Sequence, residues 1–210
     1  KPIVTYNGSA TYRKISKTLD LLSPYEFVKL QGEVKPELLT GYYQEGNDAD
    51  GTPYRYQSLD DYIGLSGVDW QGETFNPTWS QDHNFSLMGG SDNTKYNASF
   101  SRYIENGIFK NSGFDKTTAK FRLDQKINKK VSFNVTVNYA QTNRKGTGTS
   151  GDSGRFNMLA QILSARPTGG LKLTDEALLE SAIDPEMLET GESLAQVNPV
   201  KQTESVTNNK

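Results

Sequence analysis

The sequence contains four stretches with the same simple pattern: DHNFSLMGG (82–90), KYNASFSRY (95–103), AKFRLDQKI (119–127) and VSFNVTVNY (131–139). In each of them apolar and polar side chains alternate, as where Lys120, Phe121 and Arg122 follow one another. A fifth run, at residues 4–13, alternates in the same way. A period of two over segments of about ten residues is typical of β-strands with one apolar and one polar face.

The connections between these runs differ in length according to the end of the sheet at which they lie. We predict an all-β fold with helical loop insertions and five strands at residues 3–14, 82–90, 94–104, 115–127 and 131–143. In an antiparallel meander, the tight turns then fall at one end and the long connections at the other. Outer-membrane β-barrels show this sorting, together with strands of about ten residues. The pattern therefore predicts a sector of an antiparallel transmembrane β-barrel, with residues 1–210 forming a partial barrel domain.

The two longest connections carry helix signals. We predict a long extracellular loop at 16–81, with short helices near 24–31 and 59–65. The first helix has a capping serine, Ser23, followed by Pro24 and by Glu26 three residues after the cap, and Gly32 is a candidate for its end. A second extracellular loop is predicted at 145–210, with short helices near 155–165 and 175–182 and a polar, irregular end from residue 198.

The cost of charge in lipid assigns the two faces. A Lys or Arg that faces lipid at the bilayer midplane costs about 2–4 kcal/mol, so the face that carries Lys120 must line the lumen. Seven side chains are predicted to face the lumen or a plug: Asn97, Ser99, Lys120, Arg122, Asp124, Asn134 and Asn138. Eight are predicted to face lipid: Phe85, Leu87, Ala98, Phe100, Ala119, Phe121, Leu123 and Phe133. Candidates for the aromatic girdles are Tyr6, Tyr12, Tyr96, Tyr103, Phe133 and Tyr139. The alternative is that the apolar face is the core side of a soluble sheet.

Composition excludes several classes of protein. Only 34% of the residues are hydrophobic, and no uninterrupted apolar run is long enough for a membrane helix. A net charge of −2 and a pI near 5.6 argue against a nucleic-acid partner. Because there is no cysteine, disulfides and thiolate metal sites are excluded.

A linked set of motifs resembles one family. These motifs are DWQ (69–71) followed by Phe75, QDHNFSLMGG (81–90), YNASF (96–100), GIFKNSGF (107–114) and RLDQK (122–126). Together they resemble the SusC/RagA-type TonB-dependent outer-membrane transporters over residues 58–144, with weaker agreement over 1–30. The sequence departs from that family's pattern at residues 72–74, 115–119 and 129–131.

The resemblance implies a large plugged barrel of about 22 strands, of which this chain supplies the first five. It implies import of glycans or peptides, driven by TonB through a plug that the chain does not contain. The implied partners are a SusD-like surface lipoprotein, the remaining barrel strands and outer-membrane lipid. A soluble surface or periplasmic β-domain that binds glycan or protein is the alternative function.

The sequence contains no recognisable set of catalytic residues. His83 is the only histidine, which excludes histidine-paired nucleophiles and multi-histidine metal sites, so we expect no enzyme. A residue near the rim is the simpler interpretation of His83. Asp48 and Asp50 resemble the start of a calcium loop, although the later ligands and the terminal glutamate are missing.

Aromatic residues gather in the first long loop. The six that are candidates for contact with a ligand or partner are Trp70, Trp79, Tyr42, Tyr43, Tyr54 and Tyr56. Aromatic faces stack on ligands and line protein interfaces. The alternative is that they pack the loop's own core, which we favour for the two tryptophans.

Overall fold

A computed structural model of the chain describes residues 1–146, 157–182 and 198–205. The chain divides into two compact units. The sheet unit comprises Lys1–Ile15 and Asn76–Gly146, and the loop unit comprises Ser16–Phe75 and the described part of Thr147–Val206.

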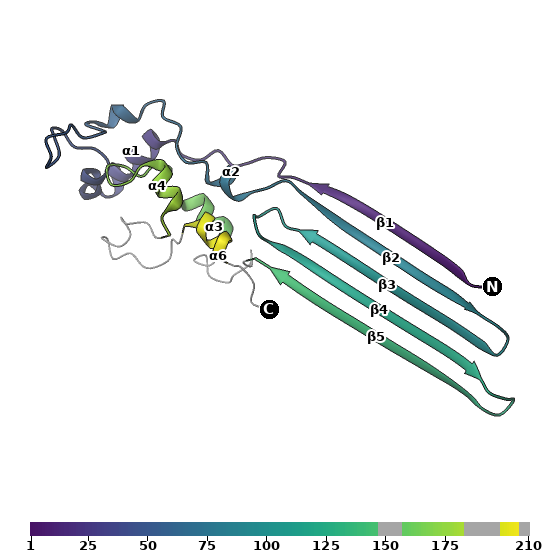
Figure 1. Ribbon diagram of the computed structural model, residues 1–210. Helices are drawn as coiled ribbons and strands as arrows, with labels where there is room; N and C mark the ends of the chain where they lie inside the picture. The colour runs from purple at the N-terminus through teal and green to yellow at the C-terminus, as the bar shows by residue number, and fades with distance from the viewer. Residues whose placement is uncertain (147–156, 183–197, 206–210) are drawn as a thin grey trace. The chain divides into compact units, whose positions relative to one another are not determined.

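The sheet unit is a five-stranded antiparallel meander in the order β1-β2-β3-β4-β5 (Figure 1). The strands are β1 (Ile3–Arg13), β2 (Thr78–Gly90), β3 (Thr94–Asn106), β4 (Gly113–Lys126) and β5 (Ser132–Lys145). Each neighbouring pair is in continuous register along its length. Within this sheet β1 and β5 are the edges, each paired on one side only.

The register aligns the apolar side chains into rows that cross the sheet. One row consists of Val4, Leu87, Ala98, Phe121 and Val137. The next row toward the long connections consists of Tyr6, Phe85, Phe100, Ala119 and Tyr139. On the other side lies a row of Gly89, Tyr96, Leu123 and Val135, followed by Phe133. We call this surface the apolar face.

The apolar face is open rather than covered. Tyr6 is 61% exposed, Val137 56% and Phe100 47%. A contiguous exposed apolar surface of this kind marks contact with a membrane or a partner.

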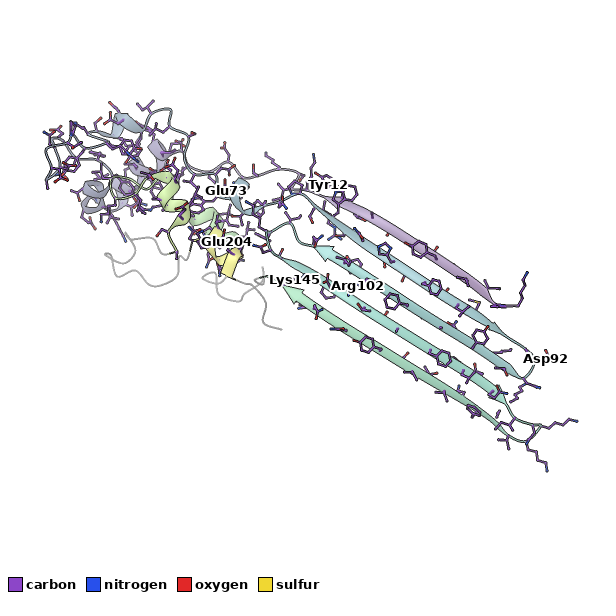
Figure 2. All side chains as sticks on the ribbon, in the orientation of Figure 1. Tyr12, Glu73, Asp92, Arg102, Lys145 and Glu204 are labelled. Atoms are coloured by element: carbon purple, nitrogen blue, oxygen red, sulfur yellow. The ribbon has the colours of Figure 1, made fainter. Side chains whose placement is uncertain are left out.

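A polar row bounds the apolar face on the side of the long connections. It contains Gly8, His83, Arg102, Thr117 and Gln141. The Arg102 guanidinium donates to the Thr117 hydroxyl at 2.6 Å and lies 3.5 Å from the Asp115 carboxylate. Figure 2 shows Arg102 and Lys145 toward one end of the sheet and Asp92 in a turn at the other.

Strands β2 to β5 extend further toward the long connections than the alternation predicted, whereas β1 ends one residue earlier. β2 begins at Thr78 rather than residue 82, β3 continues to Asn106, and β4 begins at Gly113. β5 spans Ser132–Lys145 rather than 131–143, and β1 ends at Arg13. The added residues pair through their backbones while their side chains lose the apolar–polar contrast, so a period-two criterion stops too early.

The two tight turns have local chemistry that fits them. Gly90 has φ 152°, and a side chain there would collide with the backbone of Thr94. In the other turn the Asn128 carboxamide oxygen accepts from the amides of Lys130 and Val131, at 2.8 and 2.9 Å. Both turns join strands at the end of the sheet opposite the long connections.

The loop unit contains more helical segments than the sequence predicted. They are α1 (Pro24–Val34), η1 (Pro36–Gly41), η2 (Leu59–Tyr62), α2 (Trp70–Thr74), α3 (Met158–Ser164), α4 (Asp175–Glu180) and α6 (Pro199–Ser205). Helix α6 lies where an irregular end was expected, and α2 and η1 lie in expected loop. Each is seven residues or shorter, too short for apolar periodicity to reveal.

Helix α1 passes through the residue expected to end it. Its start has the predicted capping box, because Ser23 and Glu26 bond to each other's backbone amides. Gly32 keeps a helical backbone, and Pro36 follows the cap residue Lys35. Proline therefore ends this helix, since it disfavours helical geometry in the residue before it.

Both long connections contribute to a single loop unit. The Val68 amide donates to the Pro167 carbonyl at 2.8 Å, and the Leu171 amide donates to the Gly41 carbonyl at 2.9 Å. The Asn198 carboxamide nitrogen lies within 3.1 Å of the carbonyl oxygens of Leu178, Leu179 and Ser181.

Among the helices that the structure describes, none has the length and hydropathy that a membrane-spanning helix requires.

The apolar face gives a direct test of membrane contact. Replacing Phe121, in one of the central apolar rows, with arginine should lower the free energy of unfolding in lipid vesicles by about 2–4 kcal/mol, because the guanidinium would face hydrocarbon. The measurement is a denaturant titration in vesicles. The matched control is Ser99→Arg on the opposite face, which should change the free energy of unfolding by no more than about 0.5 kcal/mol. Equal losses for both variants would contradict the face assignment.

Candidate functional site

The structure separates the tyrosines of the first long loop into buried and surface groups. Tyr42 is 1% exposed and forms a core with Val28 and Tyr62, which are fully buried. Tyr56 packs against Tyr62 with ring centroids 4.3 Å apart. Tyr54 is half-buried in the intervening segment. Tyr42 therefore serves the loop's own core.

The two tryptophans lie in different units. Trp70 begins α2, is 4% exposed, and its indole nitrogen donates to the Arg166 carbonyl at 2.9 Å, so it packs within the loop unit. Trp79 was expected in the loop, which is wrong, because it is a β2 residue paired with Tyr12. Their rings lie 5.2 Å apart and Trp79 is 55% exposed. The early start of β2 accounts for this error.

Tyr43 lines a cleft on the loop unit. Two short segments form its walls: residues 43–45 on one side and 57–60 on the other. The cleft has a volume of about 470 Å³ and is lined by Tyr43, Gln44, Glu45, Gln57, Ser58, Leu59 and Asp60. Of the six aromatic candidates, Tyr43 is the one on its surface.

Three interactions hold the cleft walls in place. The Gln44 amide donates to the Tyr56 carbonyl at 3.0 Å, which ties the first wall to the residue that precedes the second. The Tyr62 hydroxyl donates to the Tyr42 carbonyl at 2.6 Å, directly beneath the first wall. The Asp61 carboxylate accepts from the amides of Gln57 and Ser58, at 2.7 and 2.9 Å, and so fixes the second wall.

Two ionisable groups beside the cleft, Tyr62 and Asp61, have shifted pKa values. Burial raises the pKa of Tyr62 well above its usual value, and the electrostatic interaction with Tyr56 adds to the effect, so the hydroxyl remains a donor at neutral pH. Hydrogen bonds from the amides of Ser58 and Gln57 lower the pKa of Asp61.

Sequence reasoning missed the residues that organise this cleft. Ser58 and Asp61 have the spacing of a capping pair, but the helix predicted near 59–65 is the single turn η2. Nothing in the local sequence shows that Tyr62 reaches Tyr42, because the two lie 20 residues apart.

The predicted lumen residues share one face of the sheet. The register pairs Ser99 with Lys120 and Lys120 with Asn138. It likewise joins Asn97 to Arg122 and Asp124 to Asn134. Arg122 and Asp124 form an ion pair at 3.0 Å, and with Asn97 and Lys95 they line a hollow of about 570 Å³ near the tight turns.

A second polar cluster lies on this face near the long connections. The Tyr103 hydroxyl donates to the Glu105 carboxylate at 2.6 Å, and Arg13 forms an ion pair with the same carboxylate. Tyr103 was expected in an aromatic girdle, which is wrong: it lies three positions after Phe100 in the same strand, and an odd offset places it on the polar face.

His83 and the acidic pair of the first loop have local roles. His83 lies within β2 rather than at a rim, and its Nδ1 is 2.8 Å from the Tyr6 hydroxyl. The Asp48 carboxylate accepts from the amides of Asp50 and Thr52, which stabilises a turn. In the part of the chain that the structure describes, no three His, Asp or Glu residues form a group able to hold a metal ion. Calcium near Asp48 and Asp50 remains an untested prediction.

Comparison with known proteins shows which proteins this chain resembles. No family model matches the chain. Two curated proteins do: the TonB-dependent receptor SusC of Bacteroides thetaiotaomicron, 31% identical over 122 residues, and the TonB-dependent receptor P3 of Formosa agariphila, 24% identical over 155 residues. Over these residues the chain resembles the SusC/RagA-type TonB-dependent receptors, as its motifs indicate. The matches cover 58% and 73% of the chain but 10% and 13% of the relatives, so it spans about a tenth of their length.

Solved structures agree with this at the level of fold. The RagAB peptide transporter matches with a TM-score of 0.54 and 20% identity, over 78% of this chain and 20% of that one. The RagAB peptide importer in its closed-closed state matches with a TM-score of 0.50 and 17% identity, over 80% of this chain and 20% of that one.

These similarities confirm the predicted fold class and localisation. The protein is located in the outer membrane, and the five-stranded sheet is a sector of an antiparallel barrel. The interpretation as a soluble β-domain is thereby disfavoured. The assignment of individual side chains to lipid or lumen remains a prediction, which the register makes internally consistent.

The buried Tyr62 hydroxyl should control the order of the cleft. Tyr62→Phe removes the hydrogen bond from this hydroxyl to the Tyr42 carbonyl, which should lower the free energy of local opening by about 1 kcal/mol. Hydrogen exchange followed by mass spectrometry should show faster exchange in residues 42–45 and 56–62. Tyr56→Phe is the control, because it keeps the ring that packs on Tyr62, and it should leave exchange unchanged. If the two variants exchange alike, the hydroxyl does not hold the wall.

The Asp61 carboxylate should make the second wall sensitive to acid. Because its pKa is lowered on folding, its stabilising effect is complete above the unfolded pKa of about 3.9 and is lost as pH falls through the folded pKa. Protection factors of the Gln57 and Ser58 amides should be constant from neutral pH down to about 5 and should decline below that. In Asp61→Asn this acid-dependent decline should disappear; its persistence would assign it to another group.

Proposed function

We propose that this chain forms part of the wall and two surface loops of a TonB-dependent outer-membrane transporter that imports glycans or peptides. The observation that supports this most directly is the exposed apolar face, which crosses all five strands and ends at a polar row on the side of the long connections. A soluble sheet would expose this surface to water at a cost of roughly 25 cal/mol per Å².

The polar face then meets the interior of the barrel. The hollow lined by Asn97, Arg122 and Asp124 offers charged and amide groups to a plug. Large barrels of this kind are filled by a plug, and we propose that these residues contact it. TonB would act through that plug, and a SusD-like surface lipoprotein would act at the loop end. We assign the chain to binding and transport rather than catalysis.

Energised uptake tests the function. Deleting the receptor gene should abolish growth on one class of glycan or peptide as sole carbon source, and deleting tonB should have the same effect, because import depends on the proton-motive force. A tagged receptor, extracted in detergent, should copurify with a surface lipoprotein. The receptor gene restored on a plasmid is the control. Growth on every substrate of the panel in both deletion strains would contradict import.

A further inference from the structure

The cleft between residues 43–45 and 57–60 carries an inference about the solute. We infer that it is a binding site for a neutral oligosaccharide. The inference rests on the proposed function, in which the long connections form surface loops of an importer of glycans or peptides. The volume of about 470 Å³ lies within the 300–1,000 Å³ of ligand sites.

The lining combines an aromatic ring with planar polar groups. Tyr43 is half-buried and packs on the core of Val28, Tyr42 and Tyr62, so its ring is anchored at the edge of the cleft. An anchored ring offers a flat apolar surface on which the C–H face of a sugar packs.

The polar groups match hydroxyls in both directions. Gln44 and Gln57 supply donors and acceptors, Glu45 and Asp60 supply acceptors, and Ser58 supplies a hydroxyl. These four amide and carboxylate side chains are exposed. A sugar hydroxyl both donates and accepts, so neighbouring hydroxyls satisfy this mixed set.

Charge narrows the ligand further. The cleft lining contains Glu45 and Asp60 and no cationic residue. Uronic-acid or sulfated glycans would place like charge against like charge, which disfavours them. Neutral sugars meet no such penalty.

The site is preorganised. The Tyr62 hydroxyl and the Asp61 carboxylate fix the two walls from below, and neither belongs to the lining. A ligand therefore loses little affinity to ordering the walls.

The test is binding by the intact receptor in detergent micelles. The probes are an array of neutral hexasaccharides of glucose, mannose, galactose and xylose, hexasaccharides of galacturonic acid, and lysine-containing octapeptides. We expect retention of at least one neutral hexasaccharide, with a Kd that does not change between low and high salt, because no ion pair forms.

Variants assign that binding to the cleft. Tyr43→Ala should raise the Kd at least about tenfold, and Gln57→Ala by about three- to tenfold. Tyr43→Phe keeps the ring and should stay within about threefold. The matched control is Gln31→Ala on α1, outside the cleft, which should have no effect. The hydrogen-exchange patterns of the variants should match that of the wild type. If Tyr43→Ala perturbs folding, Gln57→Ala still tests the site, because Gln57 is exposed.

The outcomes separate the site from the transport function. Binding of only the octapeptides, lost in Tyr43→Ala and weakened by salt, would overturn the sugar assignment in favour of a basic peptide. The proposed site would be wrong if no neutral hexasaccharide binds, or if one binds equally well to the Tyr43 and Gln57 variants. Uptake that is lost on gene deletion yet unchanged in these variants would leave the proposed transport intact while removing the cleft from it.

Discussion

Backbone pairing governs the sheet unit. In hydrocarbon, an unpaired amide or carbonyl has no water to bond with, and each one costs several kcal/mol. The ladders between β1 and β5 run in continuous register for this reason, even where side chains no longer alternate by polarity. The same pairing fixes the side of every residue, because a slip of one position would move every side chain of the apolar face to the opposite face.

This constraint also explains why the sheet is a sector and not a domain. β1 and β5 each have one edge without a partner among the described residues. Lipid does not tolerate such edges, and a barrel removes them by closing on itself. The chain spans about a tenth of the length of its curated relatives.

The loop unit obeys a different rule, since it is held by specific side-chain bonds. It has a small core around Val28, Tyr42 and Tyr62, and its segments are joined by contacts that are distant in sequence, such as Trp70 to the Arg166 carbonyl. Tyr62 connects the core to the cleft. Its ring lies in the core, and its hydroxyl positions a cleft wall. A buried tyrosine with its hydroxyl satisfied can stabilise a fold and shape a site together.

Alternation of side chains by itself determined the five strands, their order in a meander and the face on which residues such as Phe121 and Lys120 lie, because a period of two is a local property of the chain. It could not determine strand ends such as Thr78, where only the neighbouring strand shows that pairing continues. It also misplaced Trp79 and gave no sign of Tyr62. The cleft was decided by tertiary structure alone, since its two walls come from segments whose contact depends on a buried hydroxyl 20 residues away from its acceptor.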